Sequence, residues 1–165
     1  MRWHDYHEST KHSPESLRQT THVLEWANMP DPFRHYEGVP VLDLPADPPA
    51  PDVPAMEVLQ GIGPATPVRD GQAFLSGLLF YSAAISASKL VPSTGDRYAL
   101  RVNPSSGNLH PTEFHFITRG VEQWPDGLYH YRPSSHMAEQ RARGDVYPHS
   151  ASIIFVLTSI AWRET

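Results

Sequence analysis

The distribution of proline is the feature that most restricts what this chain can fold into. Ten of its seventeen prolines lie between Pro30 and Pro67. Because proline fixes φ and lacks an amide donor, this stretch is predicted to contain neither a regular helix nor an inner strand. We therefore expect a polar, helical segment at residues 1–29, a proline-rich arm or linker at residues 30–69 and a compact part at residues 70–165. The arm either lies over a partner surface or is a loose tether.

Composition and charge exclude several classes of protein. The 165 residues suffice for one domain with a hydrophobic core. The composition, with 39% hydrophobic and 19% charged residues, excludes a highly charged disordered chain. Thirteen basic and eighteen acidic residues give a net charge of −5 without a basic run, so no nucleic-acid partner is expected. The absence of cysteine excludes disulfides and cysteine nucleophiles.

No membrane segment is predicted either. The longest purely apolar run, Ile153–Leu157, is far shorter than the roughly 20 residues that a membrane helix needs. The first residues, Met1–His7, lack the apolar region of a signal peptide. These two observations predict a cytoplasmic protein without a membrane partner.

Helix signals lie on both sides of the arm. Ser13 precedes Pro14, and a cap residue followed by proline predicts that a helix begins there. After the arm, apolar residues spaced three and four apart predict a buried helix over Ala73–Lys89, capped by Asp70.

Strand signals dominate the rest of the chain. Glu113–Thr118 and Leu128–Tyr131 are rich in aromatic and apolar residues and predict two strands joined by a wide turn. Ser135–Arg143, closed by Gly144, predicts a short helix. Ser152–Ile160 is a continuous apolar run, which is typical of a central strand. The order predicts an α+β layer structure, and a second copy, a second chain or further sequence is expected to cover the last strand.

The segment with the most candidate binding groups follows Arg101 and precedes the first predicted strand. It contains a proline, two serines, a glycine and an asparagine: Pro104, Ser105, Ser106, Gly107 and Asn108. The backbone amides of such a turn converge on an anion or on the polar edge of a flat ring, and Arg101 would add charge-assisted bonds. An ordinary surface loop has the same composition, so the residue types alone leave both interpretations open.

Histidines are the other candidate groups. His4, His7 and His12 are expected to be solvated or packed on aromatic rings, and no metal site is predicted. His115, inside the first predicted strand, is expected to be a hydrogen-bonded member of the sheet. His110 follows the loop directly and is a candidate for facing a substrate.

The loop carries a resemblance to a known family. Pro104-Ser105-Ser106-Gly107-Asn108-Leu109-His110-Pro111, followed by a strand, resembles the flavin-binding loop of the nitroreductase superfamily. More narrowly, it is similar to the SagB-type branch, which includes the azoline oxidases of thiazole/oxazole peptide biosynthesis. Residues 6–12, 126–145 and 153–163 resemble further stretches of that branch.

The resemblance implies an FMN-dependent oxidoreductase with an α+β fold, in which helices flank an antiparallel sheet. Members of the family are homodimers with two FMN sites at the interface. They transfer hydride between flavin and a small organic or peptide-derived substrate. The loop residues Pro104, Ser105, Ser106, Gly107 and Asn108 would line the flavin, and Arg101 is a further predicted cofactor contact.

Three departures leave a second function open. Residues 57–69 contain one arginine where the family has an Arg-Arg-Ser-x-Arg segment that grips the FMN phosphate. The catalytic Lys/Tyr pair of the azoline oxidases has no counterpart, and the chain is expected to be the first half of a domain. It is therefore either an FMN oxidoreductase completed by a second half or partner, or a non-catalytic half-domain used for interaction or dimerisation.

Overall fold

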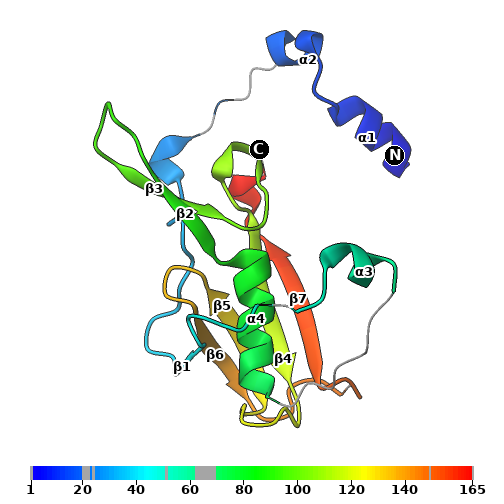
Figure 1. The fold of residues 1–165 in the computed structure, drawn as a ribbon. Coiled ribbons are helices and arrows are strands. Elements are labelled where there is room, and N and C mark those ends of the chain that lie inside the picture. The colour runs from blue at the N-terminus through cyan, green and yellow to red at the C-terminus, as the bar shows by residue number, and fades with distance from the viewer. Residues whose placement is uncertain are drawn as a thin grey trace.

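The computed structural model describes residues 2–19, 23, 25–50, 52–61, 70–148 and 150–164. A five-stranded antiparallel sheet in the order β1-β6-β5-β4-β7 carries one long helix on one face, and β2 and β3 form a separate hairpin (Figure 1). This arrangement confirms the α+β class. The strands are β1 (Val41–Asp43), β2 (Ile85–Leu90), β3 (Arg97–Arg101), β4 (Thr112–Thr118), β5 (Gly127–Arg132), β6 (Met137–Arg143) and β7 (Ile153–Ser159). The helices are α1 (Trp3–Thr10), α2 (Pro14–Gln19), α3 (Ala55–Leu59), α4 (Gly71–Ala83) and the 3₁₀ turns η1 (Trp26–Asn28), η2 (Ser106–Asn108) and η3 (Ala161–Arg163).

The two N-terminal helices stand away from the sheet (Figure 1). The predicted start of α2 is confirmed: it begins at Pro14, and the amide of Ser16 donates to the Ser13 hydroxyl over 3.0 Å. Neither α1 nor α2 has a buried residue. No helix in the described ranges has both the length and the apolar character that crossing a membrane requires.

Helix α4 begins as the sequence predicts and ends earlier. The carboxylate of Asp70 accepts from the Ala73 amide over 2.9 Å, which confirms the cap. The helix stops at Ala83 because residues 85–90 pair antiparallel with β3, whose backbone replaces the hydrogen bonds of further helical turns. The predicted continuation to Lys89 is therefore wrong.

Burial on α4 is one-sided. Leu75 and Leu79 are almost completely buried against the sheet, whereas Phe74 and Leu78 remain 39% exposed. The prediction of a helix buried on most sides is wrong, because the described residues place a layer on only one side of it.

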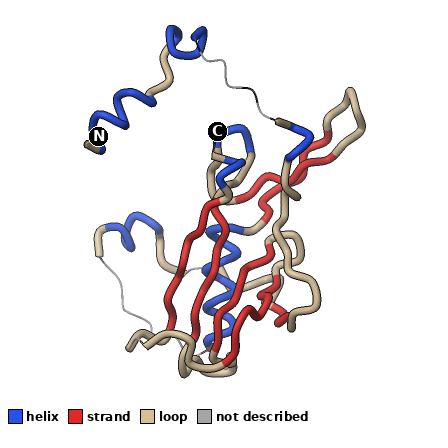
Figure 2. Tube along the Cα trace, turned by 180° about the vertical axis from the view of Figure 1, so that it is seen from behind, coloured by secondary structure: helices blue, strands red, loops and turns tan. Residues whose placement is uncertain are grey.

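The alternation of side chains gives the sheet two different faces. Phe116 and Tyr129 point toward α4 and stack with ring centroids 5.2 Å apart. On the opposite face lie Glu113, His130 and Glu139, which are equally buried. Figure 2 views the sheet from that side, where no helix crosses it.

The segment predicted as a helix over Ser135–Arg143 is a turn followed by strand β6. Its residues are good helix formers, but β6 pairs with β5 along its length and with β1 at three positions. This pairing buries Ala138, Glu139 and Gln140, and burial outweighs helix propensities of a few tenths of a kcal/mol. Gly144 has the positive φ of a helix cap, but its amide donates to the Asp126 carbonyl over 2.9 Å and extends the β5–β6 pairing at its open end.

The last strand is β7, and it lies at the sheet edge instead of the centre. Among the described residues it pairs with β4 alone, and its residues from Phe155 to Ser159 are exposed. A continuous apolar run predicts a strand but does not specify how many neighbours the strand has, so the central position was wrongly predicted.

The described part of the proline-rich arm packs on its own domain. Leu44 is buried in the core, and the carbonyls of Asp43 and Pro45 accept from Gln72 and Ser76 of α4. Strand β1 is an edge strand, which agrees with the exclusion of inner strands. The one-turn helix α3 contradicts the exclusion of helix: it begins directly after Pro54, where the missing amide breaks no helical bond.

Candidate functional site

The predicted loop joins β3 to β4 and is held by its own polar side chains. The Ser105 hydroxyl accepts from the His110 amide over 2.7 Å. The Asn108 amide group donates to the Ala99 carbonyl over 3.0 Å, and its oxygen lies 2.9 Å from Nε2 of His110. Gly107 has φ 59°, a left-handed conformation that glycine adopts without strain.

The six predicted cofactor residues lie together but differ in exposure. Pro104, Ser106 and Gly107 are exposed, and Ser105 and Asn108 are half-buried.

Arg101 is 8% exposed and holds the arm. Its Nη2 donates to the Pro32 carbonyl over 2.7 Å, and its guanidinium lies 5.0 Å from the ring centroid of Phe33. The cofactor roles of all six residues stay predictions.

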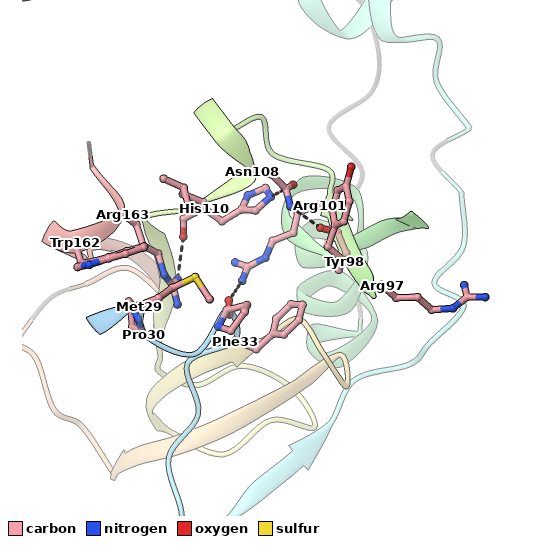
Figure 3. A pocket seen from close by; sticks show the side chains of 13 residues that line it. Met29, Pro30, Phe33, Arg97, Tyr98, Arg101, Asn108, His110, Trp162 and Arg163 are labelled. Carbon is pink, nitrogen blue, oxygen red and sulfur yellow. Dashed lines mark hydrogen bonds between the residues drawn. The ribbon is translucent and has the colours of Figure 1, made fainter. Parts of the chain in front are cut away.

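A cavity of about 270 Å³ lies between the arm, β3, the loop and the end of the described chain (Figure 3). Arg101 extends between His110 and Phe33 in that view. The walls combine apolar side chains with arginines and one histidine: Met29, Pro30, Pro32, Phe33, Arg97, Tyr98, Ala99, Arg101, Asn108, Leu109, His110, Trp162 and Arg163.

His110 lines this cavity, and its ring is held by Asn108 of the loop. Burial, followed by the positive charges of Arg101 and Arg163, lowers the pKa of His110. The Asn108 oxygen is an acceptor, so the proton of a neutral His110 ring belongs on Nε2. Nδ1 then carries the lone pair, and it is buried without a hydrogen-bond partner.

A buried chain of charges lies on the sheet face opposite α4. Nη1 of Arg163 lies 2.8 Å from Glu113, whose other oxygen lies 3.0 Å from Nε2 of His130. Nδ1 of His130 lies 2.9 Å from Glu139, which is 3.3 Å from Arg132. Each ring nitrogen of His130 therefore lies within hydrogen-bond distance of a glutamate oxygen.

These buried charges shift the pKa values of Glu113 and of the neighbouring His115. Burial raises the pKa of Glu113, but the hydrogen bond and charge of His130, with the charges of Arg101 and Arg163, outweigh burial and leave that pKa lowered. Burial, and then the charge of His130, lowers the pKa of His115 to about 4. The Nδ1 atom of His115 is buried without a partner, which contradicts its predicted role as a satisfied sheet histidine.

Sequence reasoning missed His130, Glu139 and Arg163. The available signal was charge at alternate positions of strands: Glu113 with His115, and His130 with Arg132. Within the described residues, no group of three or more acidic or histidine side chains is arranged to hold a metal ion.

Comparison with known proteins gives a structural match. No family model matches the sequence, and no curated protein matches it either. The chain is similar to the crystal structure of a "putative nitroreductase" from Anabaena variabilis ATCC 29413, with a TM-score of 0.68 and 25% sequence identity. The match covers 97% of this chain and 33% of that one, so this chain spans about a third of that protein's length. The chain therefore has a nitroreductase-like α+β fold, as its loop and strand pattern predicted.

Proposed function

We propose that this chain is part of an FMN-dependent oxidoreductase of the SagB type, to which it contributes a loop at the flavin. The observation that carries the proposal is the position of residues 104–108, between β3 and β4 of a nitroreductase-like fold. The substrate is a small organic or peptide-derived molecule, as the resemblance implies. When bound, FMN supplies the hydride chemistry, and this chain supplies binding and orientation.

The outer side of the loop suits the polar edge of a flavin ring. Ser106 and Gly107 are exposed, and a Cβ added to Gly107 would meet no atom closer than Leu109 Cγ at 3.6 Å. A flat group therefore has room to approach the backbone there. Residues 62–69 of the predicted phosphate-binding region lie outside the described residues, and Arg101 faces the arm. We infer that a partner or another part of the protein supplies contacts to the FMN phosphate.

Flavin titration tests this proposal. We expect the chain to quench FMN fluorescence, and we expect Asn108→Ala and Gly107→Val to weaken the quenching. Gly95→Val is the matched control, because Gly95 also has a positive φ but lies in the β2–β3 turn, with open space around it. Absence of quenching at high micromolar FMN would contradict flavin binding by this chain alone.

A second candidate function, an interaction or dimerisation module, rests on exposed apolar surface. Phe74 and Leu78 on α4 and Leu157 on β7 are 39%, 39% and 62% exposed. We infer that a second copy or a tandem partner domain covers this surface. Sedimentation with a hydrophobic dye tests the inference: an oligomer, or a dye-binding monomer, is expected, and a dye-silent monomer with a cooperative melt would contradict it.

A further inference from the structure

We propose that residues 30–37 of the arm form a lid that turns about Gly38, and that a ligand of the loop reaches Arg101 only when this lid is open. The inference rests on the proposed function, in which that ligand is FMN, and it adds a regulatory role for the arm. In the structure the lid is closed and occupies a predicted cofactor residue.

The closed lid separates the predicted cofactor residues. Ser106 and Gly107 are exposed on the loop. Arg101 lines the cavity and is 8% exposed. Its Nη2 atom donates to the Pro32 carbonyl, and its guanidinium lies over the ring of Phe33 (Figure 3). The lid therefore covers this guanidinium, and one ligand contacts it together with the exposed residues only after the lid has moved.

The lid is attached through side chains. Arg101 donates to the Pro32 carbonyl, and Arg163 donates to the Asp31 carbonyl. Within the part of the chain that the structure describes, no main-chain hydrogen bond joins residues 30–37 to another element. A segment held in this way opens at a lower cost in free energy than a segment held in a ladder of strand hydrogen bonds.

The chain is held differently directly after the lid. The Pro40 carbonyl accepts from the Gln140 amide over 2.8 Å, β1 then pairs with β6, and Leu44 is buried in the core. Between these two parts lies Gly38, which has φ 69° and open space around the position of an added Cβ. Glycine adopts positive and negative φ with similar ease, so an unobstructed glycine at this boundary is a suitable hinge.

Tyr36 holds the lid closed from outside the cavity. Its ring contacts His130 edge to face, with ring centroids 5.2 Å apart, and the guanidinium of Arg141 lies 3.4 Å from its centroid. Phe33 lines the cavity, whereas Tyr36 does not. Loss of the Tyr36 ring therefore loosens the lid without removing a contact from the cavity.

FMN titration of the full chain tests the lid. The apparent affinity is the intrinsic affinity multiplied by the fraction of molecules with an open lid, so we expect Tyr36→Ala and Phe33→Ala to bind FMN about threefold or more tightly than the native chain. Tyr6→Ala removes the same kind of side chain from the exposed helix α1 and is the matched control with unchanged affinity. Unchanged or weaker binding by Tyr36→Ala, with FMN binding by the native chain, would overturn the lid and leave the proposed function intact.

Trypsin digestion without FMN tests the lid separately. Cleavage after Arg34, inside the lid, requires that segment to open. We expect faster cleavage there in Tyr36→Ala than in the native chain, with unchanged cleavage after Arg18 in α2, when each rate is divided by that of the urea-unfolded chain. Equal rates after Arg34 in both proteins would overturn the lid. Faster cleavage after Arg34, without FMN binding by the native chain or either variant, would contradict the proposed function alone.

Discussion

Both faces of the central sheet contain fully buried side chains, but the two faces are stabilised in different ways. On the α4 face, Phe116 and Tyr129 pack with Leu75 and Leu79, and shape and apolar area determine the contacts. On the other face, His130 and Glu139 have no exposed surface and Glu113 has almost none, and these three side chains make charged hydrogen bonds.

This difference shows that burial alone does not identify the apolar core. The α4 face resembles an ordinary core, in which loss of volume is the main cost. The charges on the opposite face tolerate burial because they pair with one another. Tyr36 of the arm contacts His130 on this face, edge to face, with ring centroids 5.2 Å apart. Removing one charged side chain there leaves its partner buried and unpaired, and that uncompensated charge lowers the stability of the fold.

The largest expected effect is on the α4 face. Phe116→Ala is expected to lower the free energy of unfolding by about 3–5 kcal/mol, because the side chain is fully buried against three other aromatic rings. Urea denaturation measures the change. Phe74→Ala, at a 39% exposed position of α4, is the control and is expected to cost about half as much or less. Equal costs would mean that the outer side of α4 is covered in solution.

The next effect concerns the charged face. Glu139→Gln is expected to cost about 1–3 kcal/mol, because His130 and Arg132 lose a carboxylate partner inside the protein. Salt screens buried pairs weakly, so this cost should be the same at low and high ionic strength. Lys11→Gln removes the exposed pair with Glu8 and is the matched control with little effect. A cost for Glu139→Gln that vanishes in salt would contradict a buried network.

The third prediction is a pH dependence. The folded pKa of His115, about 4, lies below its ordinary value of 6.5, so the unfolded chain takes up a proton first as the pH falls. The contribution of His115 is complete above about pH 6.5 and is lost as the pH falls toward 4. His115→Gln is expected to flatten this part of the stability profile, while His12→Gln, in the exposed N-terminal segment, is expected to leave it unchanged. An unchanged slope in His115→Gln would assign the pH dependence to another group.

The smallest expected effect is at the start of α4. Asp70→Ala removes the acceptor for the Ala73 amide and is expected to cost about 1 kcal/mol. Asp70→Asn retains a capping oxygen and is expected to cost less than Asp70→Ala. Thermal denaturation of both variants measures the difference, and equal losses would show that charge, and not the cap geometry, stabilises this end of α4.

Local signals predicted the elements that local chemistry controls. The cap at Asp70, the start of α2 at Pro14 and strands β4 and β5 all follow from residue type and spacing. The loop that holds Ser105 and Asn108 was also found, because its proline, serines and glycine suit a tight turn. The position of Arg101 under the arm was not predictable, because Pro32 is far from it along the chain.

The sequence by itself therefore determined the α+β class, the resemblance of the loop to a flavin-binding loop and the starts of α2, α4, β4 and β5, since these depend on neighbours within a few residues. Only the tertiary structure decided that residues 137–143 form a strand and that β7 lies at an edge. It alone also brought Glu113, His130 and Glu139 into one buried chain. These outcomes depend on cross-strand pairing and on mutual satisfaction of charges, and both link residues whose separation along the chain carries no local signal.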